Sequence, residues 1–582
     1  MAMLRSSRLN GRTPHRALAP LLVALAYATA AGAQPRVVVD ATASRGAVSR
    51  DVFGGDLEFI NTRSPEVEAL AAELPLLRFP GGDADSVFRW DQPLAPRCTR
   101  PGFDWPAAAA VAARGHAAVF LETNIVQSTP ANAALWVQDA VGRGLRVAGV
   151  GIGNEVWGDW DAGHRSASRY AADVIAHAAA IRAVAPGTRI VLEIGTRNED
   201  AWNREAVRRT AAVIDAVDYH YYPNHHAWRD MDPAEVVAGA DGIAPLLARL
   251  RAMIRDEAGP RAGAIQVMIG EWDGAADAPL ARDRASVVTP RAYAMWSMAD
   301  ALFYGAALGE MITGGVAAAM FYEVQGFRFG AIPGDWCVDA NTAIRRPKYL
   351  VHQLWREHFG ETLLGVTASG VQTFRVDGPT NWDGFAGDAP YVRAYASLTG
   401  DGRGLRLIVT HRGGADGVAA LAVDLRGFDP SPRASVWEVG GGGLLDTNEN
   451  VRGPIDVVRT RTREIDVAGA SFTLALAPYS VMAIELRRRE APVVMDAGPA
   501  PTDAPMPRSD ATMDVGRDVT SDAGQDARTI DVGRDVPAID VAGPVVVATD
   551  GGGCGVRSTA APRAWMFALA ALLARRARRR AR

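Results

Sequence analysis

Short apolar runs alternate with longer amphipathic segments between residues 49 and 360 of this 582-residue chain. Several runs are apolar at consecutive positions, as in Val147–Ile152, which is typical of parallel strands buried on both faces. Eight strand-then-helix units over about 300 residues predict a (β/α)8 TIM barrel, an α/β fold. The eight predicted strands are Gly54–Asn61, Pro75–Gly82, Ala117–Asn124, Leu145–Asn154, Thr188–Gly195, Ala216–Tyr222, Ala264–Trp272 and Ala317–Val324.

Helical patterns fill the intervals, for example at Ala131–Val141, Ser166–Val184 and Pro290–Leu308. Pro130 and Pro290 stand where a first helical turn would begin. Proline is tolerated there because the amide it lacks would have no partner within the helix. We therefore expect a helix to begin at each of these prolines.

The pattern changes after residue 360, where short segments alternate apolar and polar residues and are separated by glycine, asparagine and aspartate. This texture predicts a C-terminal β-sandwich over residues 361–488. Residues 34–48 are expected to add an N-terminal strand to it. The predicted strands are Val371–Val376, Val392–Leu398, Leu405–Thr410, Ala419–Leu425, Ala434–Val439 and Phe472–Leu476.

The first 33 residues have the layout of a secretory signal peptide. A basic start is followed by the apolar run Ala17–Ala31 and the small residues Ala31-Gly32-Ala33. A membrane-spanning helix is the alternative, but the run is shorter than the roughly 20 residues that a span needs. We expect a secreted protein.

The end of the chain has a different composition from the predicted domains. Residues 489–552 are rich in Asp, Pro, Ala and Gly and predict a disordered linker. Residues 553–582 contain Cys554 among glycines, an apolar run and an arginine cluster. This layout resembles the C-terminal sorting tags of myxobacterial surface proteins, and an amphipathic tail without function is the alternative. The resemblance implies anchoring at the outer cell surface through the tail around Cys554.

Net charge and cysteine positions bear on the kind of partner and on a possible disulfide. The 62 Lys and Arg residues against 66 Asp and Glu give a net charge of −4, which does not favour nucleic acid as a partner. Cys98 and Cys337 follow the second and eighth predicted strands, which both flank the first in a closed barrel. They could form a disulfide in an oxidising compartment, or remain two unpaired thiols.

Two glutamates stand at the ends of predicted barrel strands. Glu155 follows Asn154 after the fourth strand, and Glu271 precedes Trp272 at the end of the seventh. The carboxyl ends of the strands form the active face of a TIM barrel, so the two side chains are expected to converge. A protonated and an ionised carboxyl about 5–5.5 Å apart can cleave a glycosidic bond with retention. We predict Glu155 as general acid/base and Glu271 as nucleophile.

Neighbouring groups are expected to push the pKa values of the two carboxyls apart. Arg78, at the end of the second strand, could hold Glu271 ionised. Glu155 is expected in a drier setting near Trp157, which favours its protonated form. Asn154 is placed to bind a sugar 2-hydroxyl, a contact that strengthens in the transition state. Either glutamate alone would suggest an ordinary salt-bridge carboxylate, whereas the pair on strands four and seven is a much more specific signal.

With this pair the sequence resembles the clan A glycoside hydrolases, whose acid/base and nucleophile lie on strands four and seven. Within the clan it resembles glycoside hydrolase family 51, the α-L-arabinofuranosidases, over about Val38–Leu486. The resemblance implies that Glu58 contacts sugar hydroxyls and that Tyr222 hydrogen-bonds the nucleophile. The motifs that carry it are Phe53–Phe59, Arg78–Asp83, Thr129–Val137, His220–Tyr222 and Pro478–Val481.

Two departures from the family pattern affect the sugar more than the mechanism. Asp83 stands where the family has a substrate-binding asparagine, and a carboxylate cannot donate the same hydrogen bond unless it is protonated. The nucleophile motif is Gly-Glu-Trp-Asp in place of Asp-Glu-Trp-Asn. Trp272 adjoins Glu271, where an indole face could stack on a sugar ring. The predicted substrate-binding set is Glu58, Arg78, Asp83, Asn154, His220, Tyr222 and Trp272.

The sequence therefore predicts a retaining glycoside hydrolase acting on a polysaccharide or oligosaccharide, with no cofactor. His220, His225 and His226 with Asp218 match no zinc-binding spacing, so no metal site is predicted. Other clan A activities stay open: β-xylosidase, β-glucuronidase and endoglucanase. A non-catalytic surface protein that binds polysaccharide is the alternative from another functional class.

Overall fold

The computed structural model describes most of the chain between residues 34 and 490. The chain divides into two compact units, residues 1–490 and 491–582, and all described residues lie in the first. The predicted signal peptide, linker and anchor segment lie outside the described residues, as do Asp83, Cys98, Cys337 and Cys554. The described ranges are 34–82, 86–93, 102–224, 232–276, 294–326, 328–334, 344–378, 383–415, 418–450, 453–454 and 457–490.

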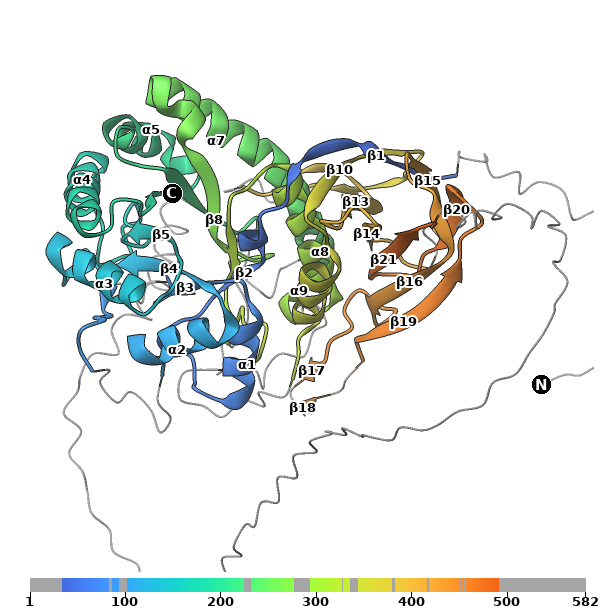
Figure 1. The fold of residues 1–582 in the computed structure, drawn as a ribbon, viewed down its shortest axis with the longest axis horizontal. Coiled ribbons are helices and arrows are strands. Elements are labelled where there is room, and N and C mark those ends of the chain that lie inside the picture. The colour runs from blue at the N-terminus through green and yellow to red at the C-terminus, as the bar shows by residue number, and fades with distance from the viewer. Residues whose placement is uncertain are drawn as a thin grey trace, which may run out of the picture. The chain divides into compact units, whose positions relative to one another are not determined.

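Eight parallel strands close into a barrel, with β2 paired to both β3 and β9 (Figure 1). Each strand falls within one of the eight predicted runs, so the predicted TIM barrel is confirmed. Apolar side chains, including Phe120, Val191 and Met268, fill the barrel interior. The strands are β2 Gly54–Asp56, β3 Leu76–Phe79, β4 Ala118–Thr123, β5 Val147–Ile152, β6 Ile190–Ile194, β7 Ala216–Tyr221, β8 Gln266–Trp272 and β9 Ala319–Phe321.

Helices cover the outside of the barrel. Helix α3 begins with Pro130 in its first turn, as predicted, and the Thr129 side chain accepts a hydrogen bond from the Asn132 amide. Helix α8 begins at Met298, because Ser297 caps it; Pro290, its predicted start, lies outside the described residues. The helices are α1 Pro65–Glu73, α2 Trp105–Gly115, α3 Pro130–Gly142, α4 Ala167–Val184, α5 Asp200–Thr210, α6 Pro233–Ala238, α7 Ile243–Ala258, α8 Met298–Thr313 and α9 Pro347–His358.

The second domain is one nine-stranded sheet that curls so that its strands share a core (Figure 1). The N-terminal strand β1 lies inside this sheet, antiparallel to β10 and parallel to β15. The C-terminal domain, predicted as a β-sandwich, is confirmed as a β-rich domain, and its strands form one curled sheet. In sheet order the strands are β19 Arg459–Asp466, β16 Pro430–Gly440, β21 Ser480–Arg488, β14 Gly404–His411, β13 Val392–Leu398, β10 Thr362–Ser369, β1 Arg36–Ala47, β15 Ala420–Arg426 and β20 Ser471–Ala475.

Several details of this domain differ from the sequence prediction, and β10 and β12 were not among the predicted strands. The predicted run Val371–Val376 forms β11 (Thr373–Val376), which pairs with β12 (Gly387–Pro390) in a separate two-stranded sheet. Strand β19 was not predicted, because seven of its eight residues are exposed and show no apolar alternation. Charged residues suit β19, since it forms an edge of the sheet and charge discourages pairing with another chain. A further two-stranded pair joins β17 (Glu449–Asn450) to β18 (Gly453–Pro454).

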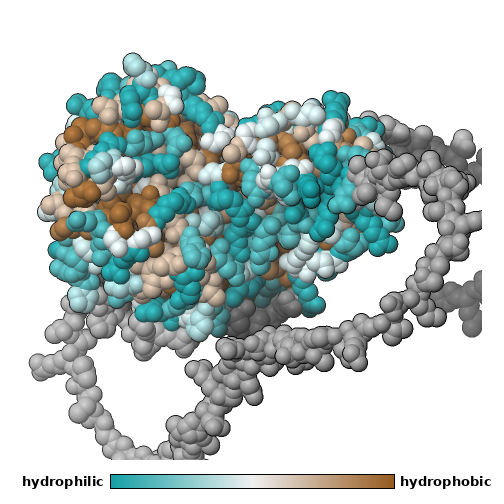
Figure 2. All heavy atoms as spheres, viewed as in Figure 1, coloured by the Kyte–Doolittle hydropathy of each residue, from teal (hydrophilic) through white to brown (hydrophobic). Residues whose placement is uncertain are grey.

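Helices α8 and α9 pack the barrel against the large sheet, with Trp355 of α9 in ring contact with Tyr395 of β13. Arg412 adds a buried ion pair, 2.6 Å from Asp241 of the barrel. In Figure 2 hydrophobic residues gather on the outer side of the barrel, while the surface over the β domain is mostly hydrophilic. Among the described residues, no helix has both the length and the apolar character needed to cross a membrane.

Candidate active site

Polar side chains replace apolar ones at the carboxyl ends of the barrel strands. On β4 and β6, alternation places Glu122 and Glu193 on the same inward side as Phe120 and Val191. Both acids are buried, so their side chains lie inside the barrel and not at the solvent-exposed surface. The whole set is Asp56, Arg78, Glu122, Asn154, Glu155, Glu193, Asp218, His220 and Glu271.

A β-bulge turns Glu271 into this set. Asp218 pairs with Met268, and His220 pairs with Glu271. Between these two pairs β8 therefore contains one residue more than β7. Strict alternation from Met268 would point Glu271 outward; the extra residue points it inward. The β8 backbone is held there by Asp218, which accepts a hydrogen bond from the Gly270 amide.

Glu271 is held as a carboxylate by three partners. Arg78 Nη1 lies 2.6 Å from its Oε1, and the Tyr222 hydroxyl donates to its Oε2 at 2.8 Å. His220 Nδ1 lies 3.5 Å from the same Oε2. Burial works against ionisation, but His220 and Arg78 outweigh it and lower the pKa of Glu271. An ionised carboxylate is what a nucleophile requires.

Arg78 is fully buried and forms ion pairs with several acids at once. Besides Glu271 it forms ion pairs with Asp56 and, at 2.6 Å, with Glu122, and it donates to Asn154 Oδ1 at 2.7 Å. Burial raises the pKa of Asp56 to about 7 and that of Glu122 to about 8. Around one arginine, Glu271 is therefore the carboxyl that keeps its charge most readily.

The prediction of a drier setting for Glu155 is wrong, because its carboxyl is more exposed than that of Glu271. Glu155 follows β5 in a turn, and its side chain is 19% exposed. His220 Nδ1 lies 3.0 Å from its Oε1, and the Trp160 indole donates to its Oε2 at 3.1 Å. The tryptophan that contacts the carboxyl is thus Trp160; Trp157, which was expected there, packs edge-on against Trp160 instead.

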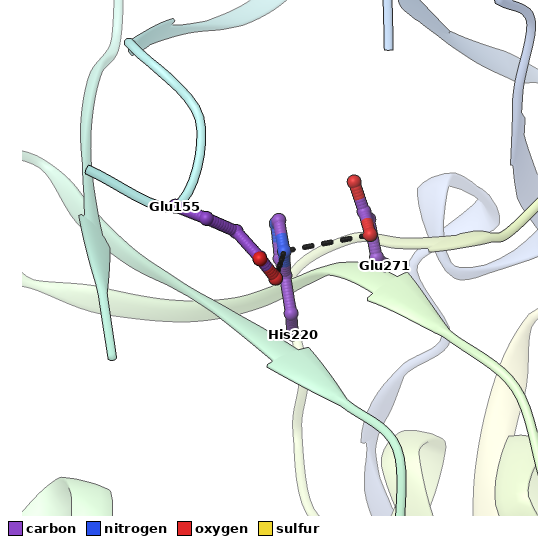
Figure 3. Close-up of side chains that lie close together, drawn as sticks. All are labelled: Glu155, His220 and Glu271. Atoms are coloured by element: carbon purple, nitrogen blue, oxygen red, sulfur yellow. Dashed lines mark hydrogen bonds and ion pairs between the residues drawn. The ribbon is translucent and has the colours of Figure 1, made fainter. Parts of the chain in front are cut away.

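Glu155 and Glu271 meet on either side of His220 (Figure 3). Ligand atoms of the three residues all lie within 4.8 Å of one another. One carboxyl oxygen of Glu155 and one of Glu271 therefore lie within 4.8 Å of each other. Within the described ranges this is also the one group of acids and histidines spaced to hold a metal ion. Arg78 already supplies a positive charge to Glu271, which disfavours a second cation.

The other predicted binding residues fall into two groups. Glu58 is buried and contacts the Tyr322 hydroxyl. Asn154 and His220 belong to the polar set already described, and Tyr222 donates to Glu271, a member of that set. Asp83 lies outside the described residues. Glu58, Arg78, Asn154, His220 and Tyr222 are thus placed at or beside the two glutamates by strands β2, β3, β5 and β7.

The prediction that Trp272 contacts the substrate is wrong, because its side chain does not lie beside the two glutamates. Its side chain is fully buried and packs against Tyr304 and Phe303 of α8, with ring centroids 4.3 and 6.1 Å away. The bulge that turns Glu271 inward turns the next residue outward toward the helices.

Half-buried aromatic rings line the site in its place. The Phe329 ring lies 6.0 Å from Tyr222 and 5.4 Å from Tyr322, centroid to centroid, and the two tyrosines are in ring contact with each other. Since Tyr222 donates to Glu271, these rings lie beside the Glu271 carboxyl. Sequence reasoning missed Phe329 and Tyr322, because both follow the last barrel strand in an irregular segment.

Sequence reasoning also did not assign a role at the site to four buried acids of the barrel strands. Asp56, Glu122, Glu193 and Asp218 each stand in or at the end of a predicted apolar run, where an isolated acid is out of place. A charge in a strand buried on both faces needs a partner, which was the available signal.

The sequence matches no family model and no curated protein. The structure is similar to an α-L-arabinofuranosidase from Thermotoga maritima, with a TM-score of 0.64 and 21% identity, covering 78% of this chain and 100% of that one. A GH51 α-L-arabinofuranosidase from Thermotoga petrophila RKU-1 gives 0.63 and 21%, with the same coverage. A family 44 endoglucanase from Clostridium thermocellum gives 0.53 and 13%, again covering 78% and 100%. At these identities the similarity establishes the fold: a TIM barrel joined to a β-rich domain, over nearly the whole described chain.

Proposed function

We propose that this protein is a retaining glycoside hydrolase. The observation that carries the proposal is the pairing of Glu155 with Glu271 across His220, with ligand atoms within 4.8 Å. The environments of the two carboxyls differ in the way that double displacement requires. Glu271 is buried beside Arg78 and has a lowered pKa, whereas Glu155 is partly exposed and can exchange protons with water.

The residues divide the reaction between them. In the first step Glu271 attacks the anomeric carbon, the glycosidic C–O bond breaks, and Glu155 gives its proton to the leaving oxygen. In the second step Glu155 takes a proton from water, whose oxygen displaces Glu271 and restores the original configuration. Tyr222 and Arg78 stabilise the carboxylate that attacks and later leaves.

For the sugar we propose an α-L-arabinofuranosyl unit released from a polysaccharide or oligosaccharide. The support is the family 51 resemblance of the strand motifs and the arabinofuranosidases among the similar structures. Buried Glu58 could accept hydrogen bonds from sugar hydroxyls, and the half-buried Tyr222, Tyr322 and Phe329 could contact a sugar face.

A panel of nitrophenyl glycosides tests the proposal directly. The purified protein should hydrolyse the α-L-arabinofuranoside faster than the β-xyloside, β-glucuronide or β-glucoside. Proton NMR of the first product formed should show the anomer of the substrate. Inverted product would contradict double displacement. Binding of arabinose-containing polysaccharide without cleavage of any panel member would favour a non-catalytic binding protein.

We also propose that the protein is exported and held at the outer cell surface. The support is the signal-peptide layout of residues 1–33 and the tail around Cys554. Protease treatment of intact cells should remove the enzyme activity, and Cys554→Ser should release it into the medium. Retention of the Cys554→Ser protein at the surface would contradict this route of anchoring.

A further inference from the structure

The backbone of Glu155 has a conformation that few non-glycine residues adopt. Its φ is 41°, and within the described chain only His116 and Tyr479 are other non-glycine residues with positive φ. In this region the Cβ atom crowds the neighbouring backbone, so the surrounding structure must hold the residue in place. The direction in which the Glu155 carboxyl points therefore depends on the group that fixes this turn.

Glu193 of β6 is the group that holds it. Its Oε1 accepts a hydrogen bond from the Glu155 backbone amide at 2.6 Å. The Glu193 side chain is 2% exposed, and strand alternation points it into the barrel with Val191. The Glu193 amide is itself bonded to the Tyr170 hydroxyl of α4 at 3.1 Å, which ties this part of β6 to the helix outside.

The same Glu193 oxygen faces the imidazole that contacts the Glu155 carboxyl. His220 Nδ1 lies 3.8 Å from Glu193 Oε1 and 3.0 Å from Glu155 Oε1. One buried carboxyl is thus adjacent both to the backbone of Glu155 and to the partner of its side chain. Within the described part of the chain, Glu193 forms no hydrogen bond or ion pair with Glu271, Arg78 or Tyr222.

We propose that Glu193 is a positioning residue for the general acid/base, an assignment that rests on the proposed glycoside hydrolase function. Glu193 keeps the turn after β5 in its left-handed form, so that the Glu155 carboxyl reaches the leaving oxygen and, later, the attacking water. Attack by Glu271 does not depend on this contact. Loss of Glu193 should therefore slow reactions in proportion to their need for acid catalysis.

Two substrates with the same sugar separate this role from a general structural one. A dinitrophenyl glycoside needs little protonation of its leaving group, whereas an oligosaccharide needs full protonation. Glu193→Met removes the acceptor at similar side-chain length. It should lower kcat/KM on the oligosaccharide by about 10²-fold but change kcat/KM on the dinitrophenyl glycoside by less than about threefold. Glu193→Gln keeps an oxygen acceptor and should recover most of the oligosaccharide rate.

Asp218→Leu is the matched control. Asp218 is also a buried acid of the barrel that accepts from a backbone amide, but that amide belongs to Gly270, beside the nucleophile. Its loss should slow both substrates by the same factor. If Glu193→Met does not fold, Glu193→Asp replaces it; it withdraws the acceptor by one methylene and should show the same selective loss on the oligosaccharide.

The outcomes distinguish failure of the proposed function from failure of the role proposed for Glu193. If the wild-type protein cleaves neither substrate, the proposed function fails and the role of Glu193 fails with it. If the wild type is active and the Glu193 variants slow both substrates equally, or neither, only the role of Glu193 is overturned.

Discussion

Glu271 and Glu155 lie on opposite sides of His220 (Figure 3), and different kinds of contact hold them in place. Glu271 is a strand residue whose carboxyl is buried and bonded to Arg78 and Tyr222. Glu155 is a turn residue whose carboxyl is partly exposed. Its backbone amide is held by a hydrogen bond to Glu193. A group that must stay ionised is thus enclosed by cations and donors, while a group that must gain and lose a proton keeps access to water.

The largest expected effect comes from removing the more enclosed of the two carboxyls. Glu271→Ala removes the proposed nucleophile, so turnover of every active glycoside should fall by at least about 10⁴-fold, measured as initial rates of nitrophenol release. Adding azide should not restore product of retained configuration. Full activity of this variant on every aryl glycoside would refute the assignment of the nucleophile.

Removing the more exposed carboxyl should cost less, and the cost should depend on the substrate. Glu155→Ala should lower kcat/KM by about 10²–10⁴-fold on oligosaccharides, because general acid catalysis is lost. A dinitrophenyl glycoside should be affected much less in the same measurement, since its leaving group departs unprotonated. Equal losses on both substrates would mean that Glu155 is not the acid.

A smaller effect should follow when only one donor to Glu271 is removed. Tyr222→Phe deletes the 2.8 Å hydrogen bond to Oε2 and should lower kcat/KM by about 10–100-fold. That bond helps to lower the pKa of Glu271, so the pKa of Glu271 should be higher in the variant. Activity that requires the ionised form is lost as pH falls through this pKa. The acid limb of the kcat/KM–pH profile should therefore move to higher pH; an unmoved limb would contradict the role of Tyr222.

The smallest kinetic effect is expected at Trp272, which adjoins the nucleophile in sequence but faces the helices. Trp272→Phe leaves a gap beside Tyr304 and should lower the free energy of unfolding by about 1–3 kcal/mol, with KM nearly unchanged. Phe329→Ala is the matched variant, because it removes one of the aromatic rings beside the Glu271 carboxyl and should raise KM. A large rise in KM for Trp272→Phe alone would restore the original prediction for this residue.

The domain plan could be predicted because it rests on local patterns. Each of the eight apolar runs contains a barrel strand, since strands buried on both faces must be apolar at consecutive positions. Strand β19 was missed for the same reason, because its exposed residues carry no such pattern. Placing Glu155 and Glu271 at strand ends required only the strand order and the rule that a barrel's active face lies there.

The sequence by itself determined the candidate residues for the chemistry: two glutamates, an arginine, a histidine and a tyrosine at predicted strand ends. It did not determine which way Glu271 and Trp272 point, or that Glu193 reaches the amide of Glu155. Side-chain direction on β8 depends on a bulge relative to β7, and register between strands is a property of their pairing. Contacts such as Glu193 to Glu155 arise only when separate strands are brought together by closure of the barrel.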